Sequence, residues 1–285
     1  IGGLLVCSGG KFQNLGGTAL NCDSMTTQGG VFLKDDFNAI GEVRLTGASI
    51  GSNLECNQGI FQGDFTGENM KVAGKFWWCE LKEIPKGKLD LLSAKLGDLV
   101  DDEASWPEKG KLFIDGLVYR PFLPGVPATA KQRKAWLELM PKGATVQPYE
   151  QLASVFRQMG LKEDAKVIAI EKQRMIRRKL KGLSRAWSWI EDLTIGYGYH
   201  PEWVFRFIVP VILLGMLVFG LAFANDVMLP TEANAQWAGA VAQGQVRSTD
   251  FAWDALAYSL DVFLPIVDLH QETAWMPDVK QAWGY

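Results

Sequence analysis

An uninterrupted apolar stretch restricts the fold of this chain more than any other feature of its sequence. Between Phe207 and Ala224 there is no charged side chain and almost no polar one. An α-helix rises about 1.5 Å per residue, so this stretch and its flanks can cross roughly 30 Å of hydrocarbon. We therefore expect a transmembrane helix over residues 203–225.

A run of basic residues precedes the apolar stretch. It consists of Lys172, Arg174, Arg177, Arg178, Lys179, Lys181 and Arg185, and no acidic residue interrupts it. Lys and Arg accumulate on the cytoplasmic flanks of membrane helices, and each contributes about 1 kcal/mol near an anionic leaflet. The loop after the apolar stretch, residues 226–250, carries Arg247 as its only cation. We expect the basic run to bind membrane lipids on the cytoplasmic side, and the loop to be external.

Residues 1–120 contain a degenerate repeat. Ile1 to Gln13 can be laid on Ile50 to Gln62 so that Ile, Gly, Leu, Cys, Gly, Phe and Gln coincide, and short apolar segments behind a glycine recur between the two copies. Short strands separated by Gly and Asn are typical of the stacked coils of a β-solenoid, where each coil buries its apolar row against its neighbours. A β-sandwich also gives regular strand spacing. The repeat favours the solenoid.

The four cysteines, Cys7, Cys22, Cys56 and Cys79, all lie within this repeat, without a CxxC pair and far from both histidines. Zinc-site spacing is therefore absent. We expect interior, reduced thiols in a cytoplasmic solenoid.

A helical region follows the repeat. Residues 121–130 contain Pro121, Pro124 and Pro127 and are expected to form a linker. Beyond them the period is helical, and residues 131–202 predict a helical hairpin and a basic juxtamembrane stalk. Apolar and small residues between Tyr149 and Ala169 resemble the packing positions of one tetratricopeptide-type hairpin. A single unit indicates a packing arrangement and not a peptide-binding array.

The C-terminal segment, residues 251–285, is predicted to be amphipathic or re-entrant, with a tail. Its candidate intramembrane polar residues are Asp254, Tyr258, Asp261 and Asp268. Carboxylates inside a bilayer are costly and face a cavity or a partner. Three interpretations stay open: an amphipathic helix on the outer surface, a re-entrant segment resembling a pore helix, or a soluble partner-binding helix.

No catalytic, cofactor-binding or metal-binding residue is indicated by the sequence. It contains no GxGxxG after a strand, no phosphate loop ending in GK[ST], no HExxH and no GxSxG. The string from Thr194 to Gly198 is similar to a potassium-channel filter, but a filter needs a membrane helix on each side. A Gly-Tyr turn is the simpler interpretation. Nothing in the charge pattern points to nucleic acid, and no cofactor is expected.

Several segments, taken in order, resemble a group of uncharacterised bacterial membrane proteins. These carry pentapeptide-like or bactofilin-like β-solenoid repeats before a membrane region, and are sometimes labelled membrane-associated oxidoreductases. The resemblance lies in Leu96 to Asp102, Asp115 to Tyr119, Gln147 to Ala153, Gly196 to Tyr199 and Leu264 to Leu269. It implies an architecture and the bacterial inner (cytoplasmic) membrane, with the N-terminal domain in the cytoplasm. It implies no catalytic residue, and no cofactor motif accompanies the oxidoreductase label.

The expected fold is a multi-domain β + α membrane protein: an N-terminal β-solenoid, a helical-hairpin stalk, and one transmembrane helix plus an amphipathic or re-entrant helix. The favoured function is a non-enzymatic, membrane-anchored scaffold or accessory subunit whose solenoid binds protein partners or self-associates. The alternative is an oligomeric, channel-like membrane protein whose re-entrant segment lines an ion path. An enzyme ranks third.

Overall fold

A computed structural model describes residues 2–231, 253–264, 266 and 268–278. The chain divides into two compact units, Ile1–Ser188 and Trp189–Tyr285. The predicted boundary at residues 121–130 falls inside the first unit.

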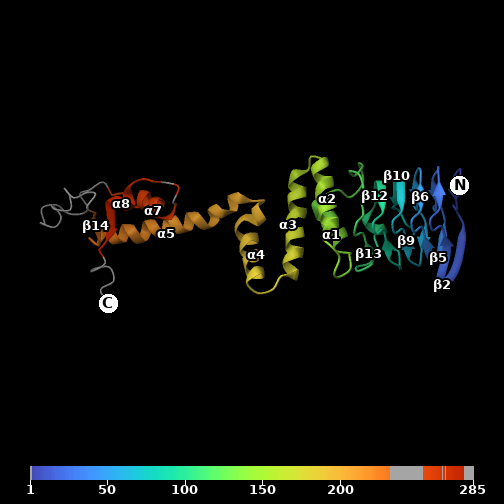
Figure 1. The fold of residues 1–285 in the computed structure, drawn as a ribbon, viewed down its shortest axis with the longest axis horizontal. Helices are drawn as coiled ribbons and strands as arrows, with labels where there is room; N and C mark the ends of the chain where they lie inside the picture. The colour runs from blue at the N-terminus through green and yellow to red at the C-terminus, as the bar shows by residue number, and fades with distance from the viewer. Residues whose placement is uncertain (1, 232–252, 265, 267, 279–285) are drawn as a thin grey trace. The chain divides into compact units, whose positions relative to one another are not determined.

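The first unit begins with a β-solenoid of about five turns, which confirms the solenoid prediction (Figure 1). Every strand pair in it is parallel. The strands are β1 (Leu5–Val6), β2 (Lys11–Asn21), β3 (Thr26–Thr27), β4 (Val31–Phe32), β5 (Asn38–Arg44), β6 (Ser49–Ile50), β7 (Leu54–Glu55), β8 (Ile60–Phe61), β9 (Phe65–Thr66), β10 (Lys71–Trp78), β11 (Leu89–Asp90), β12 (Lys95–Asp101) and β13 (Leu112–Phe113).

Successive coils are in register along the solenoid. Leu54 of β7 pairs with Phe76 of β10, and Phe76 pairs with Leu99 of β12. Hydrogen bonds between neighbouring coils join residues about one coil apart, 22 positions from Asn53 to Lys75 and 24 from Glu42 to Thr66. The strands form two sheets. The long strand β10 of one sheet pairs with both β6 and β7, and the long strand β5 of the other pairs with both β8 and β9.

Glycines stack at one corner of the solenoid. A Cβ on Gly63 would lie 2.3 Å from the carbonyl carbon of Gly41, and a Cβ on Gly87 would lie 2.3 Å from that of Gly63. Real Cβ atoms cannot approach a backbone so closely, so only glycine fits where one coil passes over another. This requirement explains why glycine recurs in the repeat.

The interior of the solenoid holds a chain of aromatic rings. Phe61 lies 5.4 Å from Phe37 and 5.0 Å from Trp78, measured between ring centroids. Phe65 continues the chain, 4.9 Å from Trp78 and 5.9 Å from Phe76. Burying one such side chain stabilises the fold by about 1.5–3 kcal/mol, so these rings form the energetic centre of the coils.

Both ladders continue into the last coil, because β13 pairs with β11 and Val118 bridges to Lys95. The short helix η1 (Glu103–Ser105) precedes this coil. Helix α1 (Ala130–Leu137) follows it, and Thr129 forms a capping box with Gln132. The end of the solenoid is thus covered by helix.

Helices α2 (Gln147–Gln158) and α3 (Lys162–Lys179) pack against each other after α1. Leu152 and Phe156 of α2 and Ile168 of α3 are buried in the same hydrophobic cluster that runs through the solenoid. One continuous core therefore joins the coils and the helices of this unit. Helix α4 (Gly182–Ile195) lies across the division between the units.

The second unit contains the predicted apolar helix. The short helices η2 (Gly196–Gly198) and η3 (Pro201–Val204) lead into α5 (Phe205–Ala224). Together, Pro201–Ala224 form a helix of 24 residues that is long and apolar enough to cross a membrane, and 6% of its most apolar window is buried. Pro210 lies in the second turn of α5.

A second helix lies along the C-terminal half of α5. It is α7 (Ala255–Phe263), and it runs antiparallel to α5, because Gly220 faces Ala255 while a Cβ on Gly215 would lie 2.6 Å from the Phe263 ring. Helix α8 (Gln271–Ala274) follows, and strands β14 (Met228–Pro230) and β15 (Trp275–Pro277) form an antiparallel pair. Residues 232–250 of the predicted external loop lie outside the described residues, as do 251, 252 and 279–285 of the last segment.

Candidate functional site

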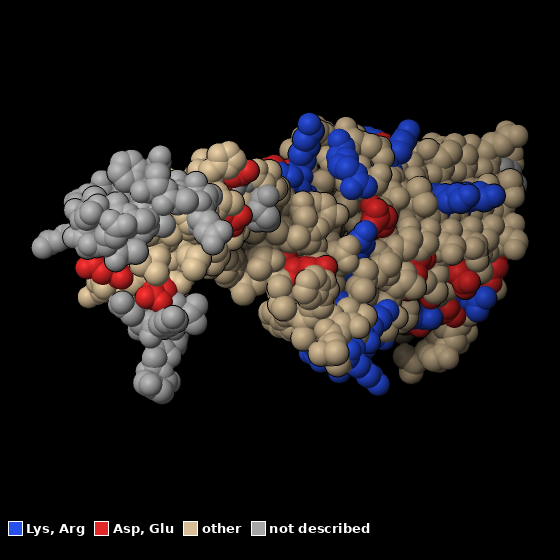
Figure 2. Space-filling view, turned by 60° about the vertical axis from the view of Figure 1, so that its left-hand side comes forward, with Lys and Arg blue, Asp and Glu red and all other residues tan. Residues whose placement is uncertain are grey.

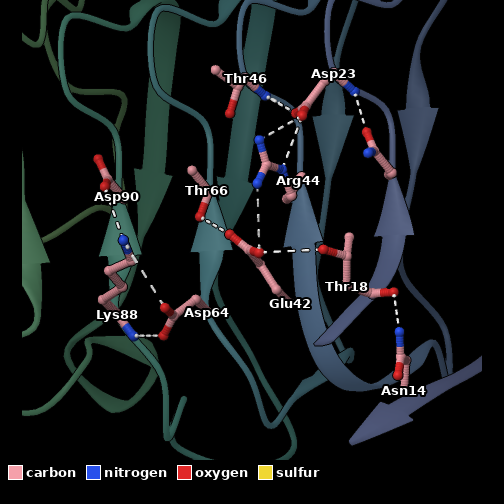
Figure 3. Close-up of polar contacts among 11 residues, drawn as sticks. Asn14, Thr18, Asp23, Glu42, Arg44, Thr46, Asp64, Thr66, Lys88 and Asp90 are labelled. Atoms are coloured by element: carbon pink, nitrogen blue, oxygen red, sulfur yellow. Dashed lines mark hydrogen bonds and ion pairs between the residues drawn. The ribbon is translucent and has the colours of Figure 1, made fainter. Parts of the chain in front are cut away.

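Charged side chains of neighbouring coils pair along one side of the solenoid (Figure 3). Asp23 accepts hydrogen bonds from the Arg44 Nε at 2.9 Å and from the Thr46 amide at 2.9 Å. Arg44 also faces Glu42, 3.9 Å away, and Glu42 accepts from the Thr66 hydroxyl at 2.8 Å. These contacts join one coil to the next, so this network serves first to hold the coils in register.

The same side continues with Lys88 between two carboxylates. Its Nζ lies 3.5 Å from Asp90 and 4.0 Å from Asp64, and it also lies over the Phe113 ring (Figure 3). On the side of the solenoid seen in Figure 2, acidic and basic groups alternate in one band, and most of the remaining surface is uncharged. Each cation of this network, Arg44 and Lys88, lies between two carboxylates, so neither is left free for an acidic ligand.

A groove on another part of the solenoid has unmatched positive charge. It has a volume of about 450 Å³, and it runs across the coils past Ser49, Lys71 and Lys95 to Arg120. Gly51, Ala73 and Gly97 form its floor. Arg120 binds Asp98 at 2.9 Å, but neither Lys71 nor Lys95 forms an ion pair with any residue that the structure describes. This groove could hold an extended acidic segment, since its cations repeat from coil to coil.

A buried ion pair lies where the solenoid meets α1. Both Nη atoms of Arg133 bind the Asp101 carboxylate, at 2.8 and 2.6 Å, and the Trp106 indole donates to the same carboxylate at 2.8 Å. Arg133 has no exposed surface, and its guanidinium lies 4.0 Å from the centroid of the Phe122 ring. Because the Arg133 side chain is completely buried, its guanidinium is not available to a ligand, and the pair holds the cap on the solenoid.

The predicted basic run divides into two groups. Lys172 binds Glu150 at 2.6 Å, Arg174 binds Glu171 at 2.9 Å, and Arg177 is buried. The other four, Arg178, Lys179, Lys181 and Arg185, are exposed. The sequence showed no acid within the run, but packing brings Glu150 of α2 next to it. Binding of this run to a membrane surface stays a prediction, and it now concerns chiefly the second group.

The predicted polar residues of the C-terminal segment contact their own unit. Asp254 caps α7, accepting from the Leu256 amide at 2.8 Å. The Asp261 carboxylate accepts from the amides of Leu269, Gln271 and Glu272 at 2.7–2.9 Å, and so fixes the start of α8. Asp268 is exposed and accepts from the His270 amide. The carboxylates are thus engaged locally, and their depth in a membrane stays a prediction.

Tyr258, on the same helix as Asp261, packs in an aromatic cluster. Its ring centroid is 4.8 Å from that of Phe219 on α5 and 4.9 Å from that of Trp253. The filter-like string also has a local role, because Tyr197 adopts a left-handed φ of 56° inside η2. It forms the turn that the sequence predicted as the simpler interpretation.

The four cysteines are unpaired thiols. The expectation of interior thiols holds for Cys56 and Cys79, which are buried, but was wrong for Cys7 and Cys22, which are partly exposed. Burial raises the pKa of all four thiols, and it raises that of Cys79 to about 12 with help from the nearby acidic side chains. Within the described residues, no group of three or more His, Cys, Asp and Glu side chains is arranged to hold a metal ion.

No protein-family model, curated protein or solved structure matches this chain. The resemblance to bacterial solenoid-bearing membrane proteins therefore depends on the residues quoted for it and on the solenoid itself.

Proposed function

We propose that this protein is a membrane-anchored scaffold or accessory subunit whose solenoid binds a partner protein on the cytoplasmic side of a bacterial inner membrane. The observation that carries the proposal is the apolar helix Pro201–Ala224, because only 6% of its most apolar window is buried among the described residues. An exposed apolar surface of this length is stable only in lipid or against another protein. The helix is thus the anchor.

The binding surface is the groove past Lys71 and Lys95. Its two lysines lie one coil apart in register, and no acid of the described chain neutralises them. We expect the partner to supply an acidic, extended segment, because the groove is long, shallow and floored by small residues. Charge complementarity of this kind sets the rate of association and the choice of partner more than the affinity.

Crosslinking in cells tests the scaffold proposal. A photoreactive residue replacing Lys71 should crosslink the partner in the membrane fraction, and one replacing Lys131 of α1, outside the groove, should not. Charge reversal of Lys95, as Lys95→Glu, should remove the crosslink at position 71 and leave the membrane content of the chain unchanged. Crosslinks of equal yield at both positions, or none at either, would contradict the proposal.

A channel-like oligomer is the second candidate. It is favoured by one observation, the antiparallel packing of α7 along α5, which would carry α7 into the bilayer as a re-entrant helix if α5 spans it. In an oligomer, the α7 helices of the subunits would then line an ion path. The test is conductance of liposomes containing the full chain: an unchanged cation current in Asp254→Ala would count against an ion path past this residue.

A further inference from the structure

A second cluster of cations surrounds a cavity beside the last turn of α3, within the first unit. The cavity has a volume of about 630 Å³, which is within the range of about 300–1,000 Å³ found for small-ligand sites. Lys109, Lys142, Arg178 and Lys179 line it, together with one carboxylate, that of Glu138. They come from the last coil, from the segment after α1 and from α3, so tertiary packing gathers them.

These cations lack the acidic partners that neighbouring cations have. Lys134 binds Glu171 and Lys166 binds Glu163, both at 2.9 Å. By contrast, Lys109, Lys142 and Arg178 form no ion pair with any described residue. The Lys179 ammonium contacts only a backbone carbonyl there, that of Ala144 at 3.5 Å. The cavity therefore has an excess of positive charge that the fold itself does not neutralise.

The floor of the cavity is apolar. Met140 and Met175 line it and pack against the hydrophobic core, and Tyr149 is buried beside them. Burial raises the pKa of Tyr149, and the nearby Arg178 guanidinium opposes this rise. Positive charge therefore lies next to the apolar floor. Flexible methionine side chains suit an irregular apolar ligand. A small free anion would satisfy the cations and leave this floor uncovered.

We propose that this cavity binds the headgroup of an anionic phospholipid, with the phosphate between Lys142 and Arg178 and the first acyl carbons on the methionine floor. This inference depends on the proposed membrane anchor, which would hold the chain at a lipid surface. The chain itself supports the choice of lipid over an acidic peptide: α3 ends beside this cavity, and the basic residues Lys181 and Arg185 follow before the apolar helix.

Native mass spectrometry of the detergent-solubilised full chain tests the proposal. The probes are dioctanoyl phosphatidylglycerol, which is anionic, dioctanoyl phosphatidylcholine, which is zwitterionic, and inorganic phosphate. We expect phosphatidylglycerol to bind at least tenfold more tightly than phosphatidylcholine. Each cation near an anionic lipid contributes about 1 kcal/mol, so Lys142→Gln with Arg178→Gln should weaken phosphatidylglycerol binding by about tenfold or more.

Two further variants separate a site effect from a loss of charge or of folding. Lys131→Gln with Lys162→Gln removes the same charge from exposed positions outside the cavity, and should leave binding unchanged. Glu138→Gln removes the one carboxylate of the cavity and should tighten phosphatidylglycerol binding several-fold, which a misfolded variant could not do. Equal binding of both lipids, equal losses in the two double variants, or displacement of the lipid by equimolar phosphate would each overturn the proposal.

Extraction of native membranes at alkaline pH distinguishes a failure of the membrane anchor from a failure of the lipid site. A chain that stays in the membrane pellet but shows no preference for phosphatidylglycerol would overturn the lipid site and leave the anchor standing. A chain that is released into the soluble fraction would contradict the anchor, and the lipid site with it.

Discussion

The two units of this protein place the same kinds of side chain in opposite surroundings. In the solenoid, Leu54 and Phe76 are completely buried, and each coil covers the next. In α5, Leu217 is 59% exposed and Leu214 is 61% exposed, although both are as apolar as any residue of the core. The hydrophobic effect acts in the first unit through folding of the chain. In the second unit it favours placing the exposed side chains of α5 in lipid or against another protein.

This comparison predicts that the first unit depends most strongly on its cap. Asp101→Ala leaves the buried Arg133 guanidinium without its carboxylate, and should lower the free energy of unfolding of this unit by about 3–5 kcal/mol. Hydrogen exchange of the segments around β10 and β12, followed by mass spectrometry, measures the change. The double variant Asp101→Leu with Arg133→Met keeps the volume apolar and should recover most of the loss. Equal losses of stability in the single and double variants would contradict a role of the Asp101–Arg133 ion pair in holding the cap.

A matched pair of leucine substitutions tests the comparison directly. Leu54→Ala should cost the first unit about 3 kcal/mol, because it leaves a cavity between coils. Leu217→Ala should cost the second unit less than about 0.5 kcal/mol, because an exposed side chain leaves no cavity. Both are read by hydrogen exchange of the full chain in detergent. A large loss from Leu217→Ala would mean that another protein surface covers α5.

The buried thiols give a predicted effect that is confined to alkaline pH. Because the folded pKa of Cys79 is about 12 and its ordinary value is 9.0, the folded state keeps the thiol neutral after the unfolded chain has ionised. The stability that this thiol contributes is therefore complete below pH 9 and is lost as the pH rises toward 12. At pH 8, iodoacetamide should label the partly exposed Cys7 and Cys22 before Cys56 and Cys79, as peptide mass spectrometry would show. Labelling of all four at one rate would contradict the burial.

The repeat in the sequence predicted the solenoid, and its clearest match spans two coils. Ile1 to Gln13 matches Ile50 to Gln62 because the two segments are two coils apart: Leu5 pairs with Val31, and Val31 pairs with Leu54. The coil between them showed only short apolar segments behind a glycine, because its interior positions tolerate any apolar residue of suitable size. Leu33, for example, occupies the rung between Cys7 and Cys56.

The groove and the cavity could not be predicted from local patterns. Lys71 and Lys95 are separated by a whole coil, and become neighbours only through the ladder. Lys109 and Arg178 lie far apart in the chain, and only the packing of α3 on the solenoid end places them around one cavity. The sequence predicted the basic run but not the ion pair of Lys172 with Glu150, because the two residues meet only when α2 packs against α3. Similarly, the β14 and β15 pair gave no sequence signal, because each strand is three residues long.

The stacked glycines of the coil corner also limit how such a protein can change in length. Inserting or deleting a few residues between Gly63 and Gly87 would place a side chain where the neighbouring backbone passes, and would turn the interior row outward. Only a whole coil can be added or lost without this conflict. Neighbouring strands lie about 4.8 Å apart, so the solenoid can lengthen or shorten only in steps of that size, and the distance it spans between two attached partners is set in discrete units.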